Sequence, residues 1–284
     1  MAQFLTQKSQ IKIKGKVKNK LSKLQKDLLL PFIVEAKKIV FNKNSGSNGT
    51  LSKEEYSEEI PTAIENVIKN ILEDIPYEEI INDTLNPKEG GEEEEDTGWL
   101  GSYGGISSPG SIRFHQNNLR KFLSAMLCYL TTNKKHNISL DQLVLLIQLI
   151  VYKTYFHEIF HHFSDIYGII SAGPVFPSRK TQKHYIFKTE EALAVAASRN
   201  VNGLFAIDGS VLIEHFFARA YQYTSLGYRD WTDFQSYKSF REGVKNYFKV
   251  HVKLQDPNFD YLEDLFEHQY VSLINNPYAD IKVV

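Results

Sequence analysis

Apolar positions recur at helical spacing in the N-terminal third of the chain. Residues 21–41 predict a helix in which Pro31 makes a break or a fresh start, because proline removes a hydrogen bond from a helix interior. Residues 61–75 carry an apolar residue every three or four positions. They predict a second helix whose first turn opens with Pro61.

Two polar stretches interrupt this pattern. Residues 42–50, "NKNSGSNGT", predict a loop. Residues 86–98, "NPKEGGEEEEDTG", are acidic and of low complexity, which indicates a flexible surface insertion. The chain therefore divides into an N-terminal basic and helical region, 1–98, and a second region, 99–284.

Strand-like alternation is confined to short runs of the second region. Residues 101–110, "GSYGGISSPG", predict turns, and "SIRFH" at 111–115 alternates like a short strand. A helix is predicted from Asn118 to Leu130, followed by a turn at 131–137. "HYIFK" at 184–188 predicts another strand.

A longer helix is predicted in the middle of this region. Ser139 and Gln142 form a capping box, which opens a helix that runs to Tyr167 and stops at Gly168. Thr189 caps the next predicted helix, over 189–199. Three further helices are expected, at 211–223, 234–249 and 259–274. The predicted fold is α+β and mostly helical, with a short mixed sheet beside the long helix.

Composition is that of an ordinary globular protein. Apolar residues make up 42% of the 284 positions and charged residues 24%. Cys128 is the single cysteine and cannot form an internal disulfide, which fits a reducing compartment. No secretory signal is visible, and the apolar run 143–152 is too short to cross a membrane. We expect a cytoplasmic protein that does not use a membrane.

Charge is unevenly distributed at the N-terminus. Residues 1–26 hold eight lysines and no acidic residue, although the whole chain has a net charge of −1. One interpretation is a solvated tail or an edge strand, since "IKIKGKVK" alternates isoleucine and lysine. The other is an arm that binds nucleic acid. The lack of aromatic residues between Lys8 and Lys26 weighs against the second.

The chemistry is concentrated in "YFHEIFHHFSD", residues 155–165. His157, Glu158 and His161 spell His-Glu-x-x-His. Residues four apart on a helix lie on one face, so both imidazoles can bind one ion. Glu158 is then placed to take a proton from water beside the metal, as a general base does. Unpaired polar groups in so apolar a helix would cost several kcal/mol, which also favours a metal site.

This motif resembles the zincins, a group of zinc metallopeptidases that carry His-Glu-x-x-His on an active-site helix. In their gluzincin branch a glutamate on a following helix is the third ligand, and "TEEALAVAA" looks like that helix. The resemblance implies a zincin-like core, a bound Zn²⁺ and Glu191 as third ligand. It also implies that Ala192 and Ala194 let the two helices approach closely.

The order of elements is similar to that of the ImmA/IrrE type of predicted cytosolic peptidases. There a short strand and a helix precede the His-Glu-x-x-His helix. That resemblance implies that the strand presents its edge to an extended peptide substrate. The residues of this strand are Ser111, Ile112, Arg113 and Phe114.

Other residues compete for roles in the site. Glu190 adjoins Glu191 and is the alternative ligand or an exposed residue at a helix N-terminus. Asp165 could support an imidazole or end the helix, His162 points about 100° from His161 and is expected to be packed or at the surface, and His215 is a weaker ligand candidate. Four residues are candidates to stabilise an oxyanion: His184, Tyr185, Tyr221 and Tyr223.

The leading hypothesis is a zinc metallopeptidase that hydrolyses a peptide bond, with His157, His161 and Glu191 on the metal. The alternative is a catalytically inactive zincin-fold protein in which zinc only staples helices and the protein binds a partner. The intact Glu158 argues against it, because a structural site has no use for a base. A third hypothesis is a metal-dependent hydrolase of a non-peptide amide.

Overall fold

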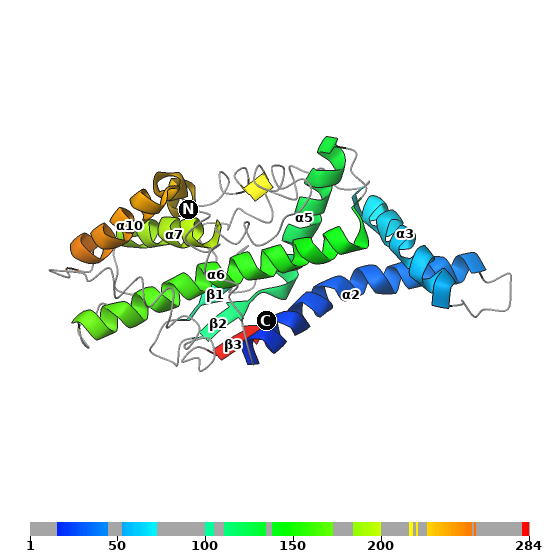
Figure 1. Ribbon diagram of the computed structural model, residues 1–284, viewed down its shortest axis with the longest axis horizontal. Coiled ribbons are helices and arrows are strands. Elements are labelled where there is room, and N and C mark those ends of the chain that lie inside the picture. The colour runs from blue at the N-terminus through cyan, green and yellow to red at the C-terminus, as the bar shows by residue number, and fades with distance from the viewer. Residues whose placement is uncertain are drawn as a thin grey trace.

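A long helix forms the axis of the fold (Figure 1). The computed structural model describes residues 16–44, 53–72, 100–104, 111–134, 138–172, 184–199, 216–217, 220, 226–251, 253 and 280–283. In Figure 1 the helices α7 (His184–Arg199) and α10 (Tyr237–Asn246) lie on one side of the long helix α6 (Leu140–Ala172), and the sheet and α2 (Lys16–Asn44) lie on the other. These elements confirm a mostly helical α+β fold.

Helix α6 begins at the predicted capping box. The Ser139 backbone N–H donates to the Gln142 side chain at 2.9 Å, and the Gln142 N–H donates to Ser139 Oγ at 3.3 Å. The helix continues past Gly168 to Ala172, so the predicted stop at Gly168 is wrong. One glycine costs a helix only about 1 kcal/mol, and packing outweighs that cost. The rings of Tyr167 and Phe248, for example, pack edge to face with their centroids 4.6 Å apart.

The N-terminal helices α2 and α3 (Lys53–Leu72) both contain a proline. Pro31 lies on the exposed side of α2, and the buried face continues across it from Leu28 to Phe32. Pro61 lies inside α3, not in its first turn. Both proline predictions are therefore wrong, because the buried apolar face of each helix outweighs one lost backbone hydrogen bond.

Helix α2 is also longer than its apolar pattern predicted at both ends. Lys16–Lys18 belong to it, so the part of "IKIKGKVK" that the structure describes is helical and not an edge strand. The first three positions of the predicted loop 42–50 are its last turn. The acidic insertion at 86–98 lies outside the described residues.

The sheet has three described strands in the order β1-β2-β3. Strand β1 (Gly101–Tyr103) runs antiparallel to β2 (Ser111–Phe114), with Gly101 opposite Phe114. Strand β3 (Asp280–Val283) runs parallel to β2, so the predicted mixed sheet is confirmed. Residues 101–103 were predicted as turn. They form a strand because β2 pairs with them and the Gly104 N–H donates to the Ser111 carbonyl at 2.8 Å.

Helix α5 (Gln116–Lys134) follows β2 directly and confirms the helix predicted over 118–130. It takes in residues 131–134 of the predicted turn, where the Thr131 hydroxyl bonds back to the Leu127 carbonyl at 2.9 Å. Helix α7 begins at His184, so the predicted strand 184–188 is wrong and Thr189 is not a cap. A five-residue apolar run fits either structure, and here it adds a turn to the following helix.

Four short elements complete the described chain. Helix α9 (Leu226–Arg229) leads into the 3-10 helix η4 (Asp230–Phe234), and α10 then runs into the π-helix η5 (Tyr247–His251). Ser236 caps α10, which confirms most of the helix predicted over 234–249. Only residues 216, 217 and 220 are described within 211–223, and they are helical and buried. The helix predicted over 259–274 lies outside the described residues.

One hydrophobic core runs through the described elements. It includes Leu24 and Leu28 of α2, Ile64 of α3 and much of α6. The helices of the N-terminal region thus share a core with those after residue 99. Residues Leu140–Gly168 of α6 are long and apolar enough to cross a membrane, a longer stretch than residues 143–152 suggested. Most of it is buried against the rest of the protein, as in a core helix.

Candidate metal centre

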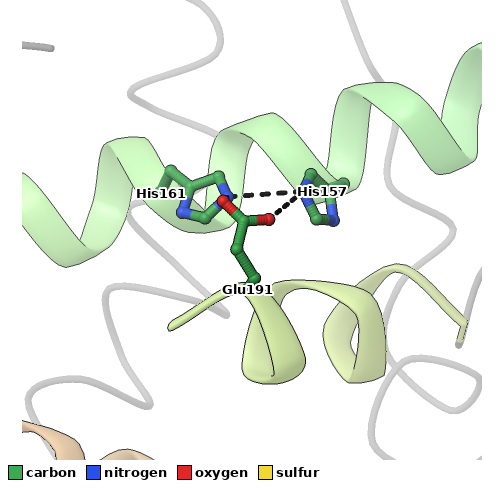
Figure 2. A group of neighbouring side chains, drawn as sticks. All are labelled: His157, His161 and Glu191. Atoms are coloured by element: carbon green, nitrogen blue, oxygen red, sulfur yellow. Dashed lines mark hydrogen bonds and ion pairs between the residues drawn. The ribbon is translucent and has the colours of Figure 1, made fainter. Parts of the chain in front are cut away.

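Two helices bring the predicted ligands together (Figure 2). His157 and His161 lie one turn apart on α6 and point toward α7, and Glu191 rises from α7 between the two imidazoles. Among the described residues these three form a group whose potential ligand atoms all lie within 4.8 Å of one another. Ala192 and Ala194 are fully buried on α7, as expected for closely approaching helices.

The separations between these atoms suit one shared ion. His157 Nε2 lies 3.0 Å from Glu191 Oε2, and His161 Nε2 lies 3.3 Å from Glu191 Oε1. The two Nε2 atoms are 3.3 Å apart. Ligand atoms at tetrahedral distances of 2.0–2.1 Å from zinc are about 3.3 Å from each other. The three residues can therefore hold a metal ion with little rearrangement.

The charge of Glu191 is suited to a ligand. Burial by itself raises the pKa of this carboxyl, but the charge of His161 and hydrogen bonds to both imidazoles outweigh burial and hold the pKa well below its usual range. Glu191 is thus an ionised carboxylate with a side chain only 5% exposed. A buried anion facing two imidazoles is a donor set that favours a divalent cation.

Glu190 occupies the opposite side of His161. Its Oε1 lies 2.7 Å from His161 Nδ1, the ring nitrogen that faces away from the ligand group. Its Oε2 accepts a hydrogen bond from the Tyr247 hydroxyl at 2.6 Å. Of the two adjacent glutamates, the structure places Glu191 and not Glu190 in the group that could hold a metal. Glu190 is fully buried, so it is not an exposed N-terminal residue.

Glu158 lies outside the ligand group, against strand β1. A Cβ atom built on Gly101 would lie 3.1 Å from Glu158 Oε1 and 2.6 Å from Thr154 Cγ2. The carboxylate therefore occupies space that only a glycine at position 101 leaves open. Glu158 is 6% exposed and is held between α6 and the sheet, next to the two histidines.

The remaining histidines and acids of the motif are packed. His162 is 1% exposed, and its Nδ1 lies 3.2 Å from the Tyr103 hydroxyl, which joins α6 to β1. Asp165 is buried and is not part of the ligand group. The competing ligand His215 lies outside the described residues. So do Tyr221, Tyr223 and the side chains of His184 and Tyr185.

Sequence reasoning missed the aromatic residues that surround the site. Tyr228 of α9 stacks on the His157 ring, with centroids 5.5 Å apart and planes at 12°. Gly227 makes this approach possible, since a Cβ there would lie 2.9 Å from the Lys188 backbone and 3.1 Å from Glu191 Cβ. Neither Tyr228 nor Tyr247 follows a recognisable motif. Only the glycine before Tyr228 hints at a close helix contact.

The predicted substrate strand requires a correction. Strand β2, which holds Ser111, Ile112, Arg113 and Phe114, is the central strand, paired with β1 on one side and β3 on the other. Its backbone is therefore not open to a peptide, because a parallel strand from far along the chain fills the second edge. Within the described residues β1 is the edge strand nearest Glu158.

Comparisons with known proteins give no match. No protein-family model, no curated protein and no solved structure matches the chain.

Proposed function

We propose that the protein is a zinc-dependent peptidase that hydrolyses a peptide bond in a protein or peptide substrate. One observation carries the proposal: the ligand atoms of His157, His161 and Glu191 lie 3.0–3.3 Å from one another. Glu158, which could act as the base, directly follows His157 on α6. Two imidazoles and one carboxylate match the ligand set of catalytic zinc sites that keep a fourth position open. The resemblance to gluzincins points the same way.

Zinc and Glu158 have separate roles in the proposed reaction. Zinc, when bound, supplies Lewis acidity that polarises a carbonyl and makes water nucleophilic at neutral pH. Glu158 takes one proton from the attacking water as its oxygen bonds to the carbonyl carbon. The same carboxyl then gives that proton to the amine nitrogen as the carbon–nitrogen bond breaks. Both transfers need Glu158 to stay beside the reacting carbon, which its close packing against Gly101 favours.

Strand β1 is the element we assign to peptide binding in place of β2. It is the edge strand of the described sheet, and it lies against Glu158. An extended peptide that paired with the backbone of Gly101–Tyr103 would run past the general base. This arrangement selects unfolded or extended segments as substrates over folded surfaces.

A zinc-stapled binding protein is the alternative, and the burial of the site favours it. The side chains of His161 and Glu191 are only 2% and 5% exposed, as in closed structural sites. His157 is more open, at 12%, and its ring lies against Tyr228. The two functions differ in their need for Glu158.

Replacing Glu158 with glutamine separates the two. We expect E158Q to keep wild-type zinc content and to lose about 10²–10⁴-fold in the rate of peptide cleavage, because the amide cannot accept the proton. Zinc is measured by atomic emission, and cleavage by mass spectrometry of a mixed peptide library. E58Q, on the exposed surface of α3, is the matched control and should cleave like the wild type. No cleavage by either protein would leave the binding protein as the better description, and cleavage at equal rates would show that Glu158 is not the general base.

A further inference from the structure

We propose that Glu190 and Tyr247 form a positioning pair that fixes the ring of His161 for metal binding. This inference rests on the proposed metal site and assigns two residues to its support. His161 Nδ1 lies 2.7 Å from Glu190 Oε1, and Glu190 Oε2 lies 2.6 Å from the Tyr247 hydroxyl. Helices α6 and α7 and the π-helix η5 each contribute one member of this chain.

Consecutive glutamates contact the two nitrogens of one imidazole. Glu190 Oε1 lies at Nδ1, and Glu191 Oε1 lies 3.3 Å from Nε2. Adjacent side chains on a helix point about 100° apart. Glu190 and Glu191 can therefore contact different nitrogens of the His161 ring, although both lie on α7. Each glutamate thus has its own nitrogen, and the roles of supporting residue and ligand are separated by a single position.

The contact with Glu190 decides which nitrogen carries the proton. Glu190 makes the closer of the two carboxylate contacts of His161, at 2.7 Å from Nδ1 against 3.3 Å from Nε2 for Glu191, so Nδ1 is the preferred donor. A neutral ring with its proton on Nδ1 keeps its lone pair on Nε2, which faces His157 and Glu191. That is the tautomer a metal needs, and carboxylates that accept from the far nitrogen of a ligand histidine also raise its basicity.

Tyr247 holds Glu190 in this role. The Tyr247 side chain is 1% exposed and Glu190 is 0% exposed, so neither can exchange its partner for water without local opening. The hydroxyl donates to the oxygen of Glu190 that His161 does not contact. With one oxygen bound by each partner, the carboxylate cannot turn toward the ligand group and compete with Glu191. Tyr247 starts the π-helical turn, a distortion that is frequent at functional sites.

The test compares zinc affinity with ring tautomer in wild type and three variants. Zinc binding is measured by competition with a chromophoric chelator, and the His161 tautomer by ¹⁵N NMR of the zinc-free protein. We expect E190A to bind zinc about 10–100-fold more weakly than wild type. E190Q, whose amide oxygen still accepts from Nδ1, should recover part of that loss. Y247F should lose less, about two- to tenfold, since it removes only the bond that orients Glu190.

S198A is the control for a merely structural effect. It removes a buried hydrogen bond, from Ser198 Oγ to the Val195 carbonyl at 2.9 Å, on the same helix α7. We expect it to lower the Tm and to leave the zinc Kd and the tautomer unchanged. If E190A and Y247F behave like S198A, Glu190 and Tyr247 only pack the core and the inference is overturned.

The NMR readout keeps this inference separate from the proposed function. A neutral His161 ring that carries its proton on Nε2 in the zinc-free wild type would overturn the inference even if zinc binds. A wild type that binds no zinc would overturn the proposed peptidase instead. In that case an Nδ1–H tautomer that is lost in E190A still supports the positioning pair.

Discussion

At the residue scale, two glycines shape the site because they have no side chain. Gly101 and Gly227 each lie where a Cβ would collide with α6 or α7, the first against Glu158 and the second against the α7 backbone beside Glu191. The first glycine lets strand β1 approach Glu158, the proposed general base. The second lets α9 place Tyr228 on His157. Both sides of the site are therefore shaped by close backbone contacts.

Replacing Gly101 with alanine should disturb the base without disturbing the metal. The new methyl would lie 2.6 Å from Thr154 Cγ2 and 3.1 Å from Glu158 Oε1, so either β1 or the carboxylate must move. We expect kcat/KM to fall by about tenfold or more, because misplacement of a catalytic group by about 1 Å can cost 10²-fold. Zinc content should not change, and unchanged kcat/KM in G101A would contradict this role.

G104A is the matched control for that experiment. It adds the same methyl near the same strand, but its nearest neighbour is Ser111 Oγ at 2.7 Å, a short side chain that can rotate away. We expect its kcat/KM to stay within a few-fold of wild type. The difference between the two variants then measures the confinement of Glu158.

At the element scale, the β1–β2 pair connects the sheet to the site. The His115 N–H donates to the Leu100 carbonyl at 3.0 Å, and Ser102 Oγ lies 3.1 Å from His115 Nε2. The Tyr103 hydroxyl contacts His162 of α6. Strand β1 is thus held by His115, which follows β2, and by His162, which follows the proposed ligand His161.

The state of His115 should make this pair sensitive to mild acid. Burial, followed by the charge of Arg113, holds the pKa of His115 below its usual value of 6.5. Between that lowered pKa and 6.5 the unfolded chain binds more protons than the folded protein, so stability falls as pH falls. We expect the free energy of unfolding, from urea titrations at pH 7.5 and 5.5, to drop more for wild type than for H115Q. Identical drops would show that His115 contributes nothing to the pH dependence.

How well the elements were predicted depends on how local their causes are. The capping box of Ser139 and Gln142 and the ligand spacing of His157 and His161 act within one turn, and both were predictable. The strand at 101–103 and the helical start of α7 were not, because partners elsewhere in the chain decide them. Tyr228 and Tyr247 reach the site from helices far along the sequence, and periodicity carries no information about such contacts.

At the scale of the whole molecule, the proposed metal site would link ion binding to folding. The ligands come from α6 and α7, two helices of the shared core, so an ion that binds them stabilises the folded chain by mass action. Zinc at 100 times its Kd contributes about 2.7 kcal/mol, provided that it does not bind the unfolded chain. A bound ion would then support the core as well as the proposed chemistry.

Stripping zinc should therefore lower thermal stability. We expect a chelator to reduce the Tm by about 5 °C, measured by differential scanning calorimetry, and added zinc to restore it. H161A and E191A should show no such shift because each lacks a ligand. H162A removes an equally buried imidazole that lies outside the ligand group, so it should be destabilised but keep the shift. A shift that survives in E191A would mean that zinc acts elsewhere.

Because β3 pairs with β2, the sheet cannot be completed until residues 280–283 have been synthesised. Phe114 meets Val283 in this ladder, so β2 leaves the ribosome long before its neighbour exists. At 5–20 residues per second the delay is about ten to thirty seconds. During that interval an apolar strand has a bare backbone flank, which is where a chaperone or a second nascent chain can attach. Slower translation of the intervening stretch would lengthen this exposure and lower the yield of folded protein.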